Sequence, residues 1–223
     1  MVLLVDKIHK FNKFCNLIGY DLNQFLKLYE GQIMPETDLE KSSLFKNLID
    51  SNLNSAQYSY VNKVCNLRNK DSRSSEEYAR DLVISWLVED MVKDYLQLQS
   101  NGADQERVFL TRHKIKYDSD FKAGNRLLEL YVNFTNYWTK TKKIDLRMDK
   151  YLHLVEKKSL MLGIAFEDLK FYIIDFGKNE IPFYENYNYF WKKKCYTCNK
   201  FDNFHDINLM REHLNNHVQQ YEI

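Results

Sequence analysis

The chain has 223 residues, and its 32 lysine and arginine residues nearly balance 31 aspartate and glutamate residues. This balance excludes a polycation that coats nucleic acid non-specifically, although it leaves room for local basic patches. No apolar run reaches the roughly 18 residues that a membrane-spanning helix needs. Lys7 and Lys10 follow the apolar residues 1–5 too closely for a signal peptide. We therefore expect an intracellular, cytoplasmic protein with no membrane partner.

The first 70 residues are expected to form a helical region. Apolar residues recur at three- and four-residue spacing on both sides of Gly19, which predicts two helices broken near that glycine. Gly31 closes the second helix. A polar stretch, Asn66 to Ser75, predicts a loop, and we place the start of the next domain at residue 71.

The middle of the chain, residues 71–185, carries alternating helix and strand patterns. In chain order these patterns predict a helix to about residue 98, strands over 108–117 and 126–134 around a turn at 122–125, a helix over 145–158, and strands over 160–166 and 170–176. The expected fold class is α+β or α/β, with a mixed sheet flanked by helices.

The tail, residues 186–223, carries the pattern Cys195-x2-Cys198-x14-His213-x3-His217. Thiolate and imidazole are the ligands that Zn²⁺ prefers, and four of them close a tetrahedral structural site. The spacing of His213 and His217 puts both imidazoles on one face of a helix. The spacing of Cys195 and Cys198 suits a tight knuckle between two short strands. The sequence therefore predicts one structural zinc ion on these four residues. The alternative is a disulfide or free cysteines beside an ordinary amphipathic helix.

Phe204 and Met210 occupy the aromatic and apolar positions of a known pattern, so the tail resembles the Cys2His2 zinc finger. The stretch between the second cysteine and the first histidine is longer here than is usual in that family. The resemblance implies a small ββα module that docks on DNA or only stabilises the tail. For DNA contacts it points to Arg211 at the helix start, and Lys193 before the knuckle is placed to engage phosphate.

Three carboxylates flank the predicted hairpin of the middle domain. Asp118 and Asp120 end one strand, and Glu129 lies in the next. A hairpin of this spacing can bring an Asp and a Glu side by side, where they can hold Mg²⁺ with a substrate phosphate completing the shell. Glu129 lies among leucines, where an unpaired carboxylate would be costly to bury. The pattern therefore predicts a magnesium site on Asp120 and Glu129.

The segment from Asp120 to Leu130 resembles the PD-(D/E)XK nuclease superfamily, with the restriction-endonuclease-like core spanning about residues 76–176. The resemblance implies catalytic Mg²⁺ on Asp120 and Glu129, with Asp118 as a further carboxylate. Tyr131 stands where that family usually has a lysine, and the family is known to recruit one from elsewhere. The nearby candidates are Lys140, Lys142, Lys143 and Lys150, of which we assign Lys140 and Lys142 as catalytic. Glu89 resembles an additional acidic residue of the family. A degenerate or coincidental motif is the alternative.

Aromatic and basic residues interleave directly after the predicted metal strand. Lysines and hydroxyl groups can hold phosphates while aromatic rings stack on bases. The predicted nucleic-acid contacts in this segment are Tyr137, Trp138, Lys143 and Arg147. The alternative is a loop whose rings fill the core and whose lysines are solvated.

Together these patterns predict a Mg²⁺-dependent endonuclease of restriction or phage type that hydrolyses double-stranded DNA, with sequence specificity. Cutting both strands would require a homodimer, since one such site cuts one strand. The alternative is a non-catalytic zinc-finger protein that binds or regulates DNA, and a third interpretation is a protein-interaction module that uses zinc only for folding.

Overall fold

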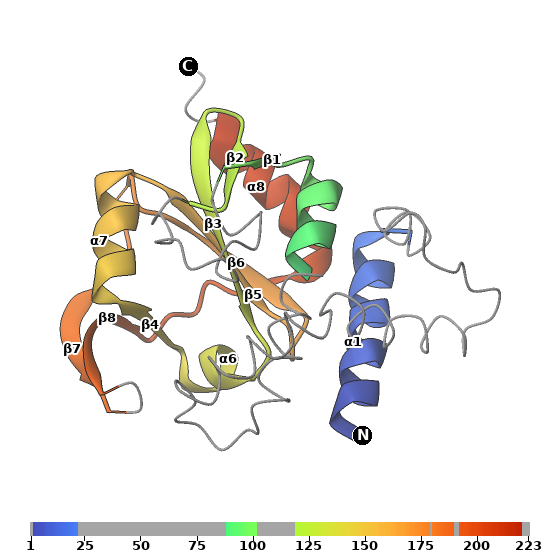
Figure 1. Ribbon diagram of the computed structural model, residues 1–223, viewed down its shortest axis with the longest axis horizontal. Helices are drawn as coiled ribbons and strands as arrows, with labels where there is room; N and C mark the ends of the chain where they lie inside the picture. Colours follow the sequence, from blue (N-terminus) through green and yellow to red (C-terminus); the bar gives the residue numbers. More distant parts are fainter. Residues whose placement is uncertain (1, 22–87, 102–118, 179, 190–191, 220–223) are drawn as a thin grey trace, which may run out of the picture. The chain divides into compact units, whose positions relative to one another are not determined.

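The computed structural model describes residues 2–21, 88–101, 119–178, 180–189 and 192–219 (Figure 1). Two compact units divide the chain, the first formed by Met1–Val92 with Phe109–His113 and the second by Lys93–Val108 with Lys114–Ile223. Within the described ranges, none of the helices combines the length and apolar character that a bilayer crossing needs.

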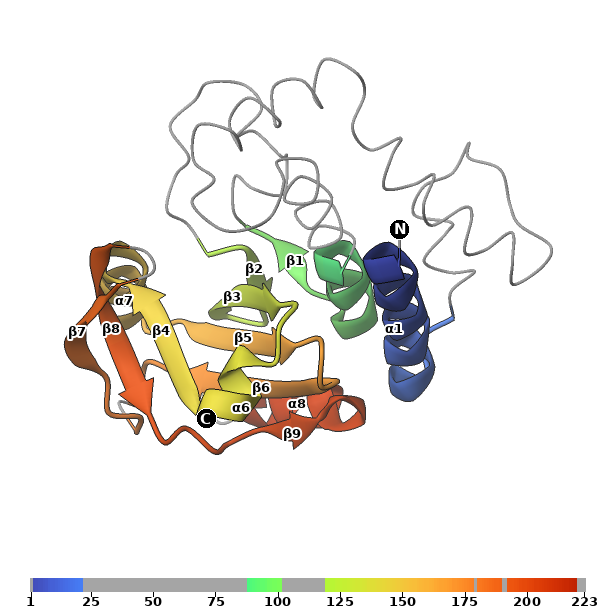
Figure 2. The same ribbon diagram turned by 90° about the horizontal axis from the view of Figure 1, so that it is seen from below.

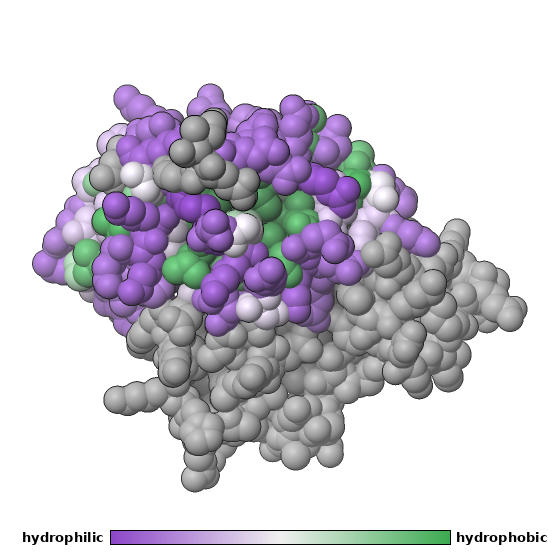
Figure 3. Space-filling view, turned by 90° about the horizontal axis from the view of Figure 1, so that it is seen from above, coloured by the Kyte–Doolittle hydropathy of each residue, from purple (hydrophilic) through white to green (hydrophobic). Residues whose placement is uncertain are grey.

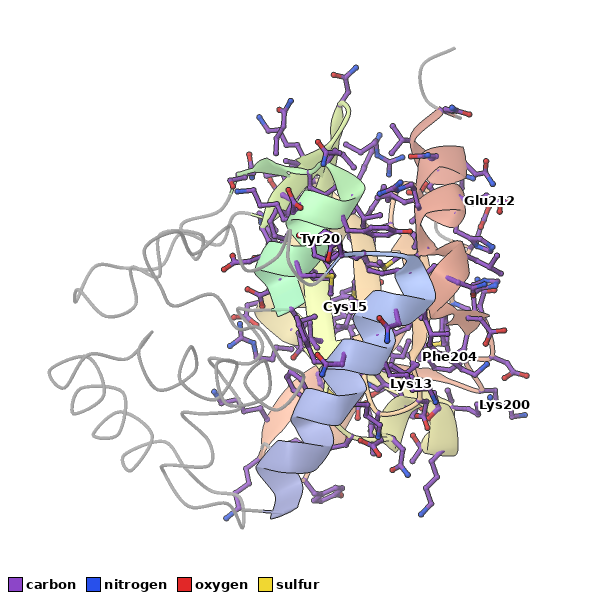
Figure 4. All side chains as sticks on the ribbon, turned by 90° about the vertical axis from the view of Figure 1, so that its right-hand side faces the viewer. Lys13, Cys15, Tyr20, Lys200, Phe204 and Glu212 are labelled. Carbon is purple, nitrogen blue, oxygen red and sulfur yellow. The ribbon has the colours of Figure 1, made fainter. Side chains whose placement is uncertain are left out.

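The described part of the first unit begins with helix α1, Val2–Ile18. The helix ends at Gly19, whose φ of +67° is a conformation that glycine adopts without steric cost. The helix break predicted near Gly19 is therefore confirmed. Burial raises the pKa of Cys15, near the end of α1, to about 12, so its thiol is inert at neutral pH (Figure 4). The second predicted helix, which Gly31 closes, lies outside the described residues.

A six-stranded mixed sheet forms the centre of the second unit, with the strand order β1-β2-β3-β5-β6-β9. Its strands are β1 Gln99–Ser100, β2 Phe121–Ala123, β3 Arg126–Asn133, β5 Leu160–Ala165, β6 Lys170–Asp175 and β9 His205–Asp206. Only β3 and β5 pair in parallel within this sheet, and the other neighbours are antiparallel. Three of the predicted strands are confirmed as β3, β5 and β6. The strand predicted over 108–117 lies outside the described residues.

A second sheet of three antiparallel strands has the order β4-β8-β7. Its strands are β4 Lys143–Arg147, β7 Tyr184–Asn188 and β8 Lys193–Asn199. Helix α6, Tyr137–Thr141, precedes β4, and helix α7, Met148–Glu156, follows it. The helix predicted over 145–158 is therefore wrong in its first turn. Ile144 and Leu146 alternate on one face of β4 and pair with β8, which holds this segment extended.

The main core described lies between the two sheets. It contains Trp138, Ile144, Leu146, Leu154, Met161, Ala165, Tyr172, Ile174, Phe176, Cys198 and Phe201. Helix α7 packs on β4 and β8, whereas helix α8, Met210–Gln219, packs on β6 (Figure 2). In the view of Figure 3 the described surface is mostly hydrophilic around a smaller apolar area.

The residues after 185 are bonded into this unit. β8 pairs with β4 in the three-stranded sheet, while β9 pairs with β6 in the six-stranded sheet. A 3-10 turn, Ile207–Leu209, then leads directly into α8. The predicted order of strand, strand and helix is thus present, but the two strands belong to different sheets.

Tyr172 fills the space over Gly163. The two residues pair across β5 and β6, and Tyr172 is fully buried. Its ring contacts Trp138, Phe201 and Phe204 edge to face, with Phe204 labelled in Figure 4. Among the described residues its hydroxyl has no hydrogen-bond partner. A large ring over a strand glycine therefore fills the core at the cost of a buried polar atom.

Replacing Tyr172 with Phe is expected to raise the free energy of unfolding by about 1 kcal/mol, because a buried hydroxyl with no partner costs desolvation energy. Urea denaturation of the purified protein measures this change. Tyr189→Phe, at a side chain that is 84% exposed, is the control and should leave stability unchanged. A loss of stability in Tyr172→Phe would contradict the prediction.

Candidate functional site

Asp120 and Glu129 lie opposite one another at the open end of the β2–β3 hairpin, Asp120 just before β2 and Glu129 within β3. Phe121 pairs with Leu128, so the next position outward places Asp120 across from Glu129. Asp120 Oδ2 accepts a hydrogen bond from the Leu130 backbone N–H at 2.9 Å, which fixes the carboxylate against β3. The juxtaposition of Asp120 and Glu129 predicted from their spacing is therefore present. Asp118 lies outside the described residues.

Lys150 reaches this carboxylate pair from helix α7. Its Nζ forms an ion pair and hydrogen bond with Glu129 Oε1. The side chains of Lys150 and Glu129 are 22% and 4% exposed, so the cluster opens to solvent on the lysine side. The structure thus brings one of the four lysines named from the sequence to the two carboxylates.

The lysines assigned as catalytic lie elsewhere, and this assignment is corrected. Lys142 pairs with Asp202 at 2.5 Å and lies over the Phe204 ring, while Lys140 is exposed on α6. Lys150 was one of four lysines near Glu129 in the sequence. It reaches the site because α7, which begins at Met148, connects β4 of one sheet to β5 of the other. The spacing of residues in the sequence does not reveal this path.

The electrostatics of the cluster favour a bound cation. Burial, and then the neighbouring Asp120 carboxylate, raise the pKa of Glu129 to about 8 even though Lys150 acts in the opposite direction. Burial lowers the pKa of Lys150, but Glu129 and Asp120 outweigh it and the net change is upward. Lys150 therefore stays protonated at neutral pH. One added positive charge would allow both carboxylates to ionise together.

The free oxygen of Glu129 fits this interpretation. As a carboxylate, Glu129 has a buried Oε2 with no hydrogen-bond donor within the described ranges, and when protonated Glu129 shares a hydrogen bond with Asp120. A pair of carboxylates suits Mg²⁺ or Mn²⁺, because these ions take oxygen ligands and keep open positions for water and phosphate. In the described part of the chain, no cluster of three or more His, Cys, Asp or Glu side chains is arranged for a metal. Additional ligands at this site would thus come from water or substrate. Glu89, the additional acid suggested by sequence, lies in a helical segment over 88–96.

The four predicted zinc ligands do not converge. Cys195 and Cys198 are three positions apart in the continuous strand β8, so their side chains point to opposite faces. Cys198 lies in the core between the sheets, while Cys195 lies beside Thr197 on the outer face. His213 and His217 are on α8, which packs on the other sheet. Zinc binding stays a prediction that these positions do not support.

The predicted zinc histidines have other neighbours. The rings of His213 and His205 lie 4.1 Å apart between centroids, and Phe171 contacts His213 edge to face. Burial is the main cause that lowers the pKa of both His205 and His217. The imidazoles of His205 and His217 are therefore mostly neutral at pH 7.

The predicted nucleic-acid contacts separate into three groups. Lys143, Arg147 and Lys193 occupy positions on one face of the three-stranded sheet, and Tyr137 donates a hydrogen bond to Asp145 on that face. Trp138 is 4% exposed and packs on Tyr131 and Tyr172, so its assignment is corrected to a core residue. Arg211 lies 4.1 Å over the Tyr95 ring and donates a hydrogen bond to the Tyr95 carbonyl.

Asp145 is a buried acid that the sequence interpretation missed. It is 6% exposed and accepts a hydrogen bond from Thr197 at 2.6 Å. The missed signal was the alternation of Lys143, Asp145 and Arg147, which the predicted helix over 145–158 obscured. In an extended strand that alternation puts all three side chains on one face.

Comparison with known proteins returned no matching family model, no matching curated protein and no matching solved structure. The functional interpretation therefore depends on the mixed α+β fold, on the Lys150–Glu129 ion pair and on the proximity of Asp120 to Glu129.

Binding of Mn²⁺ or Mg²⁺ to this carboxylate pair is expected to strengthen as the pH rises toward about 8, because the cation displaces a proton from Glu129. Without a cation, the free energy of unfolding is expected to change with pH in the opposite direction and to fall as the pH rises. A folded-state pKa above the ordinary 4.5 stabilises the fold below pH 4.5, and that contribution is lost as the pH rises through 8.

Thermal unfolding between pH 5 and 9, with and without Mn²⁺, measures both effects; this range brackets the Glu129 pKa of about 8. Stabilisation by Mn²⁺ should grow with pH in the wild type and vanish in Glu129→Gln. Stabilisation by Mn²⁺ that does not depend on pH would contradict the assignment of Glu129 as a ligand.

Proposed function

We propose that the protein is a metal-dependent nuclease that hydrolyses phosphodiester bonds of DNA at Asp120, Glu129 and Lys150. The observation that carries the proposal is that Lys150 meets the two carboxylates although it is distant from them in the sequence. A buried carboxylate oxygen with no donor in the described part of the chain supports a cation there.

The order of the elements adds support to the nuclease resemblance. A helical segment over 88–96 precedes the hairpin of β2 and β3 that carries the carboxylates, and helix α7 with the strand pair β5 and β6 follows. Glu129 lies in β3, beside the parallel neighbour β5, at the centre of the sheet. A rigid central strand is well suited to hold a catalytic carboxylate.

Each of the three side chains has a role that its position allows. Asp120 and Glu129 would hold Mg²⁺ through carboxylate oxygens. When bound, the ion supplies Lewis acidity and lowers the pKa of a coordinated water. Lys150 carries a positive charge at the solvent-facing side of the cluster, where it can neutralise a scissile phosphate. Its ion pair also fixes the orientation of the Glu129 carboxylate.

The test is cleavage of a large mixed-sequence duplex by purified protein with Mg²⁺, Mn²⁺ or EDTA. Metal-dependent fragments are expected, discrete if cleavage is sequence-specific and smeared if it is not. Lys150→Gln should lose most activity, whereas Lys140→Gln and Lys142→Gln should retain it. Equal loss in all three variants, or intact DNA with every metal, would overturn the proposal. Sedimentation in the presence of DNA tests the homodimer that double-strand cutting would require.

The second candidate is a nucleic-acid-binding protein without catalysis. It is favoured by the basic and aromatic residues on the outer face of the three-stranded sheet. It predicts a salt-dependent mobility shift of DNA that Mg²⁺ does not convert to cleavage. The zinc ion expected from the sequence on Cys195, Cys198, His213 and His217 stays a prediction, and neither candidate requires it.

A further inference from the structure

The outer face of the three-stranded sheet is polar across all three strands. Strand register places one set of alternate residues on this face, which we call the polar sheet face: Lys143, Asp145 and Arg147 of β4; Tyr184, Asn186 and Asn188 of β7; and Lys193, Cys195, Thr197 and Asn199 of β8. The alternate residues Ile144, Leu146 and Cys198 face the core. At the centre of the polar sheet face Asp145, Cys195 and Thr197 are buried, whereas Arg147, Tyr184, Lys193 and Asn199 around them are exposed.

The only acid of the polar sheet face is neutralised by its neighbours. Asp145 Oδ1 accepts from the Thr197 hydroxyl at 2.6 Å and lies 3.5 Å from Lys143 Nζ. Asp145 Oδ2 accepts from Tyr137 Oη and Asn188 Nδ2, each at 3.2 Å. This carboxylate therefore presents little negative charge to a ligand.

The cations of this face are more exposed. Arg147 has a side chain that is 53% exposed, and its contact with Asp149 is 3.5 Å long between partners half in solvent. Such a surface pair is weak and screened by salt. Lys193 is also exposed, and Lys192 precedes it in the chain. The face thus offers positive charge that suits an anionic chain.

Two tyrosine rings stand at the polar sheet face with their hydroxyls held. Tyr137, on α6, is 38% exposed and donates to Asp145. Tyr184, on β7, is 43% exposed and accepts a hydrogen bond from Asn199 Nδ2. Hydrogen bonds at the ring tips limit ring motion, so less conformational entropy is lost when a base stacks on these rings.

We propose that the polar sheet face binds a single-stranded stretch of DNA. Lys193 and Arg147 would contact phosphates, and the two tyrosines would stack on bases. Only unpaired bases can present their faces to side chains on a sheet, which favours a single strand over a duplex. The inference rests on the proposed function only in taking nucleic acid as the ligand.

The test uses a fluorescein-labelled oligodeoxythymidylate and anisotropy in EDTA, so that no cleavage occurs. Tyr184→Ala is expected to weaken binding about tenfold through loss of one stacking ring, while Tyr184→Phe keeps the ring and should bind nearly as the wild type does. The matched control is Tyr187→Ala. This residue is 44% exposed on the same strand but on the opposite face, and its loss should change nothing.

Adjacent lysines test the charge contribution. Lys193→Ala should lower the slope of log affinity against log salt by about 1, whereas Lys194→Ala should not. Lys194 points to the other face and pairs with Glu185 at 2.6 Å. A matching duplex should bind more weakly than the single strand. The inference would be overturned if the two lysine variants had equal effects, or if Tyr184→Ala and Tyr187→Ala did. Absence of binding, or tighter binding of the duplex, would overturn it as well.

The two proposals fail separately. Glu156→Gln, on an α7 side chain that is 72% exposed, should bind the oligonucleotide as the wild type does. Binding that needs Tyr184, without cleavage of any DNA, would leave this inference standing and remove the nuclease. Metal-dependent cleavage by the wild type, together with unchanged oligonucleotide binding in Tyr184→Ala, would support the nuclease and overturn this inference.

Discussion

Glu129→Gln is expected to lower the rate of metal-dependent DNA cleavage about a thousandfold or more, which corresponds to about 4 kcal/mol of transition-state free energy. An amide supplies no anionic oxygen for a divalent cation. The amide still fits the site, because its oxygen can accept from Lys150 while its NH₂ group donates to Asp120. The loss should therefore be one of chemistry, with the fold retained.

The same substitution should stabilise the protein above neutral pH. The wild type has two carboxylates facing each other, and burial and Asp120 raise the pKa of Glu129 to about 8. Removing one of the charges removes their repulsion, so we expect a higher melting temperature together with lost activity. Glu156→Gln, on an α7 side chain that is 72% exposed, is the control for both measurements. Cleavage at the wild-type rate in Glu129→Gln would remove Glu129 from the site.

Gly163→Ala is expected to lower the free energy of unfolding by about 3 kcal/mol, the upper part of the usual range for an overpacked core. A methyl group at Gly163 would lie well inside 3.0 Å of two ring carbons and the hydroxyl oxygen of Tyr172. The ring is fully buried among other aromatic side chains, so it can move away only by displacing them. Chemical denaturation with circular dichroism measures the loss.

Two further variants separate crowding from a backbone effect. Gly19→Ala meets no atom within 4 Å, but φ is +67° there, so it should cost only about 1–2 kcal/mol. Tyr172→Leu alone leaves a cavity, which the methyl of Gly163→Ala partly fills in the double variant. The double variant should therefore be more stable than the sum of the two single losses predicts. Simple additivity would show that the ring and the glycine do not interact.

The parts of the fold that sequence predicted are those with a clear period. Strands β3, β5 and β6 are long apolar runs with turns between them, and α1 ends at the expected glycine. Strand β4 was mistaken for a helix start because five residues cannot distinguish a period of 2 from 3.6 when long-range pairing with β8 decides the conformation.

The part of the site that could be predicted is the part formed by residues close together in the sequence. Asp120 and Glu129 meet through a hairpin that spacing reveals, whereas Lys150 depends on the path of α7. For the cysteines, spacing allows a knuckle but cannot show that β8 continues through both residues as a strand. Local motifs therefore predict residue pairs better than they predict sites assembled across the fold.

The most direct test of the cation site is to count Mn²⁺ ions bound, using the electron paramagnetic resonance signal of the free ion. Wild type and Glu156→Gln should bind one ion that both Asp120→Asn and Glu129→Gln lose, with stronger binding near pH 8 than near pH 6, as the Glu129 pKa of about 8 requires. Equal Mn²⁺ binding by all four proteins, or none by the wild type, would contradict a metal centre on these carboxylates.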